Sequence, residues 1–310
     1  MDNITTEKDI FRQIEHVYGF SIKSFTKAPR GWWAETFIID TDKDKYFVKL
    51  FIKEMDFKQL LNTSLVIQSL IADKIDFVPK PIKTKENLFL HTLKNKRVVA
   101  LYSYINGTNY RPKDSIELLD LMVNIYKLEI ECNNKYHFNF HGKNVMMNLQ
   151  NNIHITKYEI LKSYLKENIE LLGKYWNIYK NLFDKMDKTG TNNVITHGDL
   201  DTNLLIDNNK KVFIVDWDCI YLGPIERDMY PYVDTNTDIN ELEKIAKISG
   251  LKWKFNKNCH NYFILNHFFD DFGILINLDK NSIHDDEKLI AERIDGIQNQ
   301  LKSLGKKLFI

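Results

Sequence analysis

The sequence is poor in the residues that mark disulfide-rich, zinc-binding and membrane proteins. Three cysteines occur in 310 residues and none forms a CxxC pair, which argues against a disulfide framework or a zinc site and fits a reducing compartment. No window approaches about 18 uninterrupted apolar residues, so no transmembrane helix is expected. The charged N-terminus does not fit a signal peptide, and the expected location is cytoplasmic.

An excess of charge of one sign is also missing. Lysine and arginine total 43 against 42 acidic residues, so no overall field attracts nucleic acid or a membrane, and the expected partner is a small molecule.

Glycine-rich phosphate loops are missing as well. The turn with Pro29, Arg30 and Gly31 has one glycine and matches neither a GxGxxG nor a Walker A motif. This turn is either an ordinary hairpin or a loop over a nucleotide.

Apolar residues, by contrast, make up 44% of the chain and recur with clear periodicity. In the N-terminal third, alternating apolar residues predict strands, and two segments of helical periodicity predict helices. Thr5 or Thr6 would cap the first helix and Gly19 would end it, while the prolines of Val78–Pro81 would stop the second. Three strands are predicted at Ser21–Thr26, Trp33–Asp40 and Lys45–Phe51, and two or three more at about Ile82–Thr84, Asn87–Leu90 and Arg97–Tyr104. The second helix covers about Met55–Lys74.

The remaining two thirds of the chain are mostly helical in pattern. We place the boundary between a small N-terminal lobe, 1–105, and a larger helical lobe, 106–310, at the turn signal Asn106-Gly107. The polar segment His137–Ile155 is expected to be an irregular insertion. The fold class is therefore α+β with two lobes. The predicted helices of the second lobe are 116–130, 156–188, 225–230, 239–248, 257–278 and 282–304.

The stretch VITHGDLDTNLLIDNNKKVFIVDWD, Val194–Asp218, carries polar residues at the ends of short apolar runs. Two of these runs flank an Asp-Asn-Asn-Lys turn and predict a tight hairpin. Such a hairpin brings Asn203 and Asp216 to the same end, with Asp199 in the loop above. Mg²⁺ takes oxygen ligands and shares them with substrate phosphates, so this amide and carboxylate suit it. Asp199 is then left to accept a proton from a hydroxyl, or to align that hydroxyl, in phosphoryl transfer.

The alternative for this stretch is an ordinary polar hairpin with turn-forming Asp and Asn. An HGD triplet directly after one apolar run and a DWD triplet directly after another make that alternative less favoured. His197 is expected to bond the backbone of the metal loop rather than to act as a base. Lys49, in the strand YFVKLF, is by itself either a solvated lysine on an edge strand or a lysine that contacts nucleotide phosphates.

HGDLDTNLLI followed by FIVDWD resembles the aminoglycoside phosphotransferase and choline kinase family. The tail VDWDCIYLGPIERDM is especially similar to spectinomycin phosphotransferase-type antibiotic kinases. The likeness extends to YFVKLF, to the helix before VPKP, to YSYING and to the helical C-terminal half, but only the catalytic stretch is specific. The resemblance implies a bilobal protein-kinase-like fold, with a small antiparallel sheet lobe that carries one helix. It also implies an ATP-dependent kinase that uses Mg²⁺ and phosphorylates an alcohol group.

Carried over by position, the resemblance implies that Asp199 is the catalytic base and that Asn203 and Asp216 bind Mg²⁺. The family has four residues between the base and the amide, whereas this chain has three, Leu200 to Thr202. Either the shorter loop still brings Asn203 to the metal, or Asn203 is displaced and a neighbouring residue binds the metal instead.

The resemblance also implies that Lys49 contacts the phosphates and that main-chain groups of Tyr102 and Tyr104, in the hinge, meet the adenine. Because these hinge contacts are main-chain ones, GTP stays open as a donor. The helix after Lys49 has Thr63 and Ser64 where the family has a glutamate. The usual lysine–glutamate ion pair is thus in question, and another group is expected to hold Lys49.

Two further acids match family positions near the site. Asp218 is a second acid that either supports another metal or bonds the loop, and Asp228 is expected to be structural. A cationic acceptor would need an acidic wall, for which Asp201 and the pair Asp270-Asp271 are candidates. For that pair the alternative is a solvated helix face.

Three functions follow. The first is a kinase that phosphorylates a hydroxyl of an aminoglycoside or aminocyclitol antibiotic and confers resistance. The second is a metabolite kinase of the choline, homoserine or thio-sugar type. The third is a nucleotide-binding protein without catalysis, against which Lys49, Asp199 and Asp216 argue.

Overall fold

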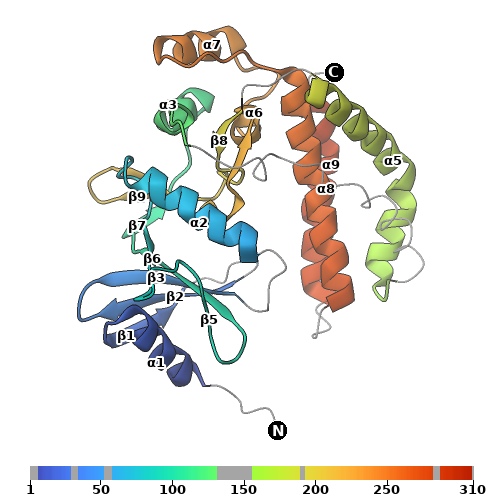
Figure 1. Ribbon diagram of the computed structural model, residues 1–310. Coiled ribbons are helices and arrows are strands. Elements are labelled where there is room, and N and C mark those ends of the chain that lie inside the picture. The colour runs from blue at the N-terminus through green and yellow to red at the C-terminus, as the bar shows by residue number, and fades with distance from the viewer. Residues whose placement is uncertain are drawn as a thin grey trace. The chain divides into compact units, whose positions relative to one another are not determined.

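The computed structural model describes residues 6–28, 34–51, 58–130, 156–188, 193–281 and 287–308 (Figure 1). No helix among these residues is long and apolar enough to cross a membrane. The predicted turn at Gly31 and the predicted insertion His137–Ile155 lie outside the described residues.

Contacts between Cα atoms divide the chain into two compact units. The first unit contains Met1–Arg111, Leu128–Glu131 and His197–Tyr221, and the second contains the rest. The stretch with the predicted catalytic residues therefore groups with the N-terminal sheet, although it comes much later in the sequence. The lobe division at residue 105 stays a prediction, because the two units interleave along the chain.

A six-stranded antiparallel sheet forms the centre of the first unit, with β5 beside β6 and the other strands in the order β1-β2-β3-β6-β4. Thr6 and Asp9 form a capping box at the start of α1, and Gly19 ends it with a left-handed φ of 73°. The elements are α1 (Glu7–Tyr18), β1 (Ile22–Lys27), β2 (Ala34–Thr41), β3 (Lys45–Phe51), α2 (Lys58–Ala72), β4 (Pro81–Ile82), β5 (His91–Thr92) and β6 (Val98–Ser103).

Helices α1 and α2 cover opposite faces of this sheet (Figure 1). Val48 and Leu50 of β3 pack in an apolar cluster with α1, and Phe47 and Phe51 pack in another with α2. Strand alternation therefore puts Lys49 on the α2 face. The residue is 6% exposed and its strand lies inside the sheet, so it is not a solvated lysine on an edge strand.

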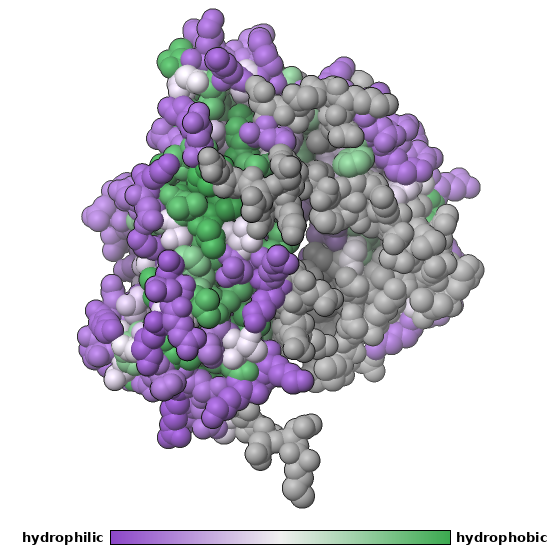
Figure 2. Space-filling model, viewed as in Figure 1, coloured by the Kyte–Doolittle hydropathy of each residue, from purple (hydrophilic) through white to green (hydrophobic). Residues whose placement is uncertain are grey.

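The surface over α2 mixes apolar and polar side chains. Val66 and Leu70 of this helix are 39% and 44% exposed, and Figure 2 shows hydrophobic side chains among hydrophilic ones on the face it presents. Scattered apolar side chains are ordinary on a protein surface, so these two indicate no docking site.

The predicted hairpin forms, and a third strand joins it. β9 (Leu204–Asp207) pairs with β10 (Val212–Ile214) on one side and with β7 (Gly107–Asn109) on the other. Gly107 therefore begins a strand. A Cβ atom on Gly107 would lie 3.0 Å from the carbonyl oxygen of Ile206 and 3.1 Å from the Cβ of Leu205. Glycine at this position permits the close approach of the two strands.

The second unit is built from helices around a core of large apolar side chains. The core lies between α5, α8 and α9 and includes Tyr262 and Phe268. The helices are α3 (Ser115–Tyr126), α5 (Glu159–Lys188), α6 (Glu226–Met229), α7 (Ile239–Ile248), α8 (Lys257–Asn281) and α9 (Glu287–Lys307), and the short strands β8 (Val194–Thr196) and β11 (Tyr221–Gly223) pair with each other.

The predicted α+β class, with an antiparallel sheet and a mostly helical remainder, is confirmed. The strand predicted at Asn87–Leu90 is wrong. Asn87 has a left-handed φ of 63° and its N–H donates to the carbonyl of Thr84 at 3.0 Å, so these residues form a turn. The strand follows one residue later, as β5.

We expect Gly107→Ala to lower the free energy of unfolding by roughly 1–3 kcal/mol, because the added methyl overpacks β7 against the backbone of β9. The midpoint of urea unfolding measures this change. Gly173→Ala is the matched control, since nothing lies within 4 Å of its added Cβ and alanine favours the helix. Equal midpoints for the two variants would contradict the close approach at Gly107.

A buried carboxyl makes the stability of the second unit depend on pH. Glu226 is 2% exposed, and its Oε1 accepts hydrogen bonds from Trp253 Nε1 at 3.0 Å and from the N–H of Asn256 at 2.7 Å. Burial outweighs these bonds and raises the pKa of Glu226 from 4.5 to about 7.

The contribution of Glu226 to stability is fully present below pH 4.5 and is lost as the pH rises from 4.5 toward 7. Between these values the carboxyl ionises in the unfolded chain but stays protonated in the folded one. Glu226→Gln keeps an accepting oxygen without the charge. At pH 8 we expect this variant to be more stable than the wild type, by up to about 3 kcal/mol in the free energy of unfolding. Near pH 4.5 we expect the two proteins to be about equally stable. Melting curves across this range test this, and a gap independent of pH would contradict it.

Candidate active site

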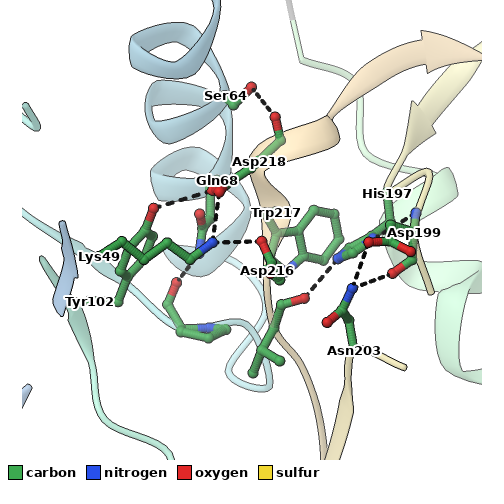
Figure 3. A network of polar contacts seen from close by, with 12 residues as sticks. Lys49, Ser64, Gln68, Tyr102, His197, Asp199, Asn203, Asp216, Trp217 and Asp218 are labelled. Atoms are coloured by element: carbon green, nitrogen blue, oxygen red, sulfur yellow. Dashed lines mark hydrogen bonds and ion pairs between the residues drawn. The ribbon is translucent and has the colours of Figure 1, made fainter. Parts of the chain in front are cut away.

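Lys49 lies at the centre of a polar network in the first unit (Figure 3). Its Nζ lies 2.5 Å from Asp216 Oδ1 and 2.7 Å from Asp218 Oδ2. The lysine side chain is 7% exposed, that of Asp218 25% and that of Asp216 43%. Two carboxylates that follow β10 therefore neutralise one buried ammonium group.

Tyr102 of β6 completes the network with its side chain. Its hydroxyl donates to Asp218 Oδ1 at 3.4 Å, and the Nζ of Lys49 lies 5.5 Å from the centre of its ring, within cation–π range. Lys49 pairs with Ala100 across the strands, so Tyr102, two residues further on, shares its face. The buried phenol was not predicted from the sequence, although Tyr102 alternates in phase with apolar residues of its strand.

Burial and charge act against each other on the three ionisable partners. Burial lowers the pKa of Lys49, but the charges of Asp216 and Asp218 outweigh it and hold that pKa well above its usual value. Burial raises the pKa of Asp216, and the ammonium of Lys49 more than reverses this, so the pKa is lowered. For Asp218 burial prevails, helped by the charge of Asp216, and the pKa is raised. Asp216 is thus the more strongly acidic partner.

Asp216 has a strained backbone. Its φ of 64° and ψ of 58° lie in the left-handed region, which residues other than glycine rarely adopt. This turn takes the chain from β10 into a 3-10 helix, η3 (Trp217–Cys219), so that both carboxylates reach Lys49. Strain of this kind concentrates at functional sites.

The loop that begins at Asp199 closes on itself. Asn203 Nδ2 donates to the main-chain oxygen of Asp199 at 2.7 Å and to its Oδ2 at 3.0 Å. His197 is fully buried; its Nε2 lies 2.8 Å from the oxygen of Val215, and its Nδ1 accepts from the N–H of Asp199 at 3.2 Å. The predicted structural role of His197 is confirmed, because it joins this loop to the strand that leads to Asp216.

A cavity of 380 Å³ lies beside the network, and all its lining residues belong to the first unit. Its volume is in the range of small-molecule sites. Lys49, Asn203 and Asp216 supply polar groups at its wall, and side chains of the sheet supply apolar ones. Other lining residues include Ile38, Phe47, Gln68, Pro79, Tyr102, Ser103, Tyr104, Ile105 and Leu205.

The donor set suits Mg²⁺. Asn203 and Asp216 line the same cavity, and both offer side-chain oxygens of the hard type that Mg²⁺ takes. The amide nitrogen of Asn203 faces Asp199, so its amide oxygen is on the opposite side. Among the described residues no group of three His, Cys, Asp or Glu side chains forms a metal cage. An ion here would complete its shell with water and phosphate oxygens.

The hinge residues keep part of their main chain in the sheet. The N–H of Tyr104 donates to the oxygen of Lys45 at 3.4 Å, and that of Ser103 to the oxygen of Lys80 at 2.9 Å. Tyr102 pairs with Phe47 in the ladder between β3 and β6. Adenine contacts of Tyr102 and Tyr104 stay a prediction.

The three candidate acids for the acceptor are not all in one unit. Asp201 belongs to the first unit, where its Oδ1 lies 3.4 Å from a guanidinium nitrogen of Arg111. Asp270 and Asp271 belong to α8 of the second unit. Asp270 accepts from Asn266 at 2.7 Å and Asp271 from Gln300 at 2.6 Å.

Asp228 acts within the second unit. Its Oδ2 accepts a hydrogen bond from the hydroxyl of Tyr126, on α3, at 3.2 Å, and the carboxylate is buried. This supports its expected structural role.

Residues 24–248 match the model of the phosphotransferase enzyme family. The chain belongs to this family. This membership confirms the predicted class of enzyme, an ATP-dependent phosphotransferase that acts on a hydroxyl group of a small molecule. The roles of individual residues stay predictions.

Relatives of known structure confirm the protein-kinase-like fold of this phosphotransferase. Spectinomycin phosphotransferase, solved with ADP and spectinomycin, has a TM-score of 0.75 at 16% identity, over 98% of this chain and 100% of that chain. Choline kinase LicA from Streptococcus pneumoniae has a TM-score of 0.60 at 12% identity, over 96% and 99%. Protein LicA homolog of Mycoplasma capricolum subsp. capricolum is 24% identical over 195 residues, 61% of this chain and 71% of the relative.

We expect His197→Ala to lower the free energy of unfolding by about 2–4 kcal/mol, because it removes the hydrogen bonds of the buried imidazole to the main chain of Asp199 and Val215 and opens a void beside Trp217. Urea unfolding measures the loss. His16→Ala, at an exposed site on α1, is the control and should change stability by less than about 0.5 kcal/mol. Equal stabilities of the two variants would refute the bridging role of His197.

Proposed function

We propose that this phosphotransferase transfers the γ-phosphoryl group of ATP to a hydroxyl of a cationic aminocyclitol or aminoglycoside antibiotic and so confers resistance. The observation that carries the proposal is the exposed carboxylate of Asp199, which accepts a hydrogen bond from Asn203. Asn203 in turn lines the same cavity as Lys49 and Asp216. A hydroxyl at Asp199 would then lie beside the polar wall of a nucleotide-sized cavity.

In the proposed donor site, the apolar part of the cavity takes the base and Lys49 holds phosphate oxygens. The hydrogen bonds of its network give the lysine one orientation in advance, which lowers the entropic cost of ordering it on binding. We assign adenine recognition to the segment Tyr102–Ile105, through main-chain groups outside the sheet ladder. Such contacts do not select strongly between purines, so GTP is tested beside ATP.

In the proposed reaction, Asp199 accepts the proton of the acceptor hydroxyl or aligns it for attack. The two hydrogen bonds from Asn203 and the bond from its own N–H to His197 fix the position of Asp199. When bound by Asn203 and Asp216, Mg²⁺ would supply charge neutralisation at the phosphates.

For the cationic groups of the acceptor we propose two separate candidates, Asp201 in the first unit and the pair Asp270-Asp271 on α8 of the second unit. The side chain of Asp270 reaches the surface and accepts a hydrogen bond from Asn266, and its pKa is raised to about 6, chiefly by burial, so it still carries a charge at neutral pH. Asp201 shares its charge with Arg111 and is the weaker candidate. The likeness in fold to spectinomycin phosphotransferase across nearly the whole chain supports an aminocyclitol as the acceptor.

A second candidate is a metabolite kinase for choline or a related amino alcohol. It is supported by the sequence match to the Protein LicA homolog and by the likeness in fold to choline kinase LicA. Both candidates need an acceptor with a hydroxyl and a positive charge, so the site residues alone do not separate them.

An acceptor panel separates the two candidates. The purified protein is incubated with ATP or GTP, Mg²⁺ and single acceptors from both classes, and products are identified by mass spectrometry. A gain of one phosphoryl group on spectinomycin or an aminoglycoside supports the first candidate, and the same gain on choline alone supports the second.

We expect Asp199→Asn to reduce kcat by at least ~100-fold and to leave ATP binding within about twofold, because the amide cannot accept the proton but keeps the shape of the carboxylate. Asp184→Asn, on an exposed position of α5, is the control and should keep full turnover. Undiminished turnover in Asp199→Asn would rule out the proposed role of Asp199.

A further inference from the structure

Helix α2 gives Lys49 no anionic partner. Its span Lys58–Ala72 contains no acidic residue. The side chains that it turns toward the network are Ser64 and Gln68, both buried and both uncharged (Figure 3). A lysine that is 7% exposed must be paired by another element, because an unpaired buried charge is strongly disfavoured.

The two carboxylates that pair with Lys49 differ in what else they face. Asp216 lines the cavity and is 43% exposed, so it is accessible to a ligand. Asp218 is 25% exposed and is not among the residues that line the cavity. One of its oxygens bonds Lys49, and the other accepts from the buried hydroxyl of Tyr102. Both oxygens of Asp218 are therefore engaged within the protein.

Asp218 is also joined to α2 through its main chain. The hydroxyl of Ser64 lies 3.3 Å from the carbonyl oxygen of Asp218, and the amide of Gln68 donates to the oxygen of Pro79 at 2.7 Å. The helix is thus hydrogen-bonded to the residue that holds the lysine.

We propose that Asp218 is the positioning residue for Lys49, in place of a carboxylate on the crossing helix. When Asp216 engages a metal ion, its hold on Lys49 weakens, and Asp218 keeps the ammonium aimed at the phosphates. This inference rests on the proposed function in one respect, the contact of Lys49 with nucleotide phosphates. It assigns Asp218 no direct contact with metal or substrate.

Nucleotide binding without an acceptor tests this role. Calorimetry measures the affinities of Asp218→Asn and wild type for ATP and for adenosine at several Mg²⁺ concentrations. We expect Asp218→Asn to bind ATP at least ~10-fold more weakly, the usual cost of one charge-assisted bond, and to bind adenosine as the wild type does. The Mg²⁺ concentration for half-maximal ATP binding should stay unchanged, whereas Asp216→Asn should raise it.

Two further variants complete the experiment. Ser64→Glu combined with Asp218→Asn returns a carboxylate to the helix and should recover part of the ATP affinity, which a purely structural role of Asp218 would not allow. Asp73→Asn removes an exposed ion pair with Lys80 in the same unit and should leave ATP binding unchanged.

The possible failures are distinguishable. If the wild type binds no ATP, the proposed function fails, and this inference with it. If the wild type binds ATP and Asp218→Asn binds it equally well, only the positioning role is overturned. A raised Mg²⁺ requirement in Asp218→Asn would make Asp218 a metal ligand and would overturn the role too. An acceptor panel without product leaves the binding test intact.

Discussion

The ammonium group of Lys49 is the constraint on which the first unit depends. A buried positive charge must have anionic partners, and this chain supplies them from residues 167 and 169 positions away. To bring them there, the chain turns through a left-handed conformation at Asp216 and enters η3 at once. The local strain is held in place by the sheet, by His197 and by the hydroxyl of Tyr102.

The same arrangement joins parts of the chain that the linear order separates. β7 pairs with β9, the N–H of Ile214 donates to the oxygen of Phe77 at 3.0 Å, and that of Val215 to the oxygen of Asn203 at 2.9 Å. Main-chain hydrogen bonds therefore join the β9–β10 hairpin to the N-terminal part of the first unit. A rigid main-chain frame of this kind fixes side chains more closely than flexible loops do, which suits a site whose chemistry depends on position.

Much of the fold could be predicted because the signals are local. The capping box of α1, its glycine stop and the apolar alternation of β2 and β3 depend on neighbours within a few residues, and the predicted elements are confirmed there. The strand predicted at Asn87–Leu90 failed because a left-handed asparagine overrides weak apolar alternation. The strand at Gly107 could not be predicted, since its partner lies about a hundred residues later and only their close approach requires glycine.

For the site, the sequence by itself determined the family motif and the residue types: a lysine in an apolar strand, the HGD and DWD triplets, and a helix without a glutamate near Lys49. Those features depend on composition and spacing. Only the tertiary structure decided that Asp218 and Tyr102 enclose Lys49, and that a loop of three residues places Asn203 against Asp199. The physical reason is that ion pairs between distant segments depend on how strands register and turn in space, which no local pattern encodes.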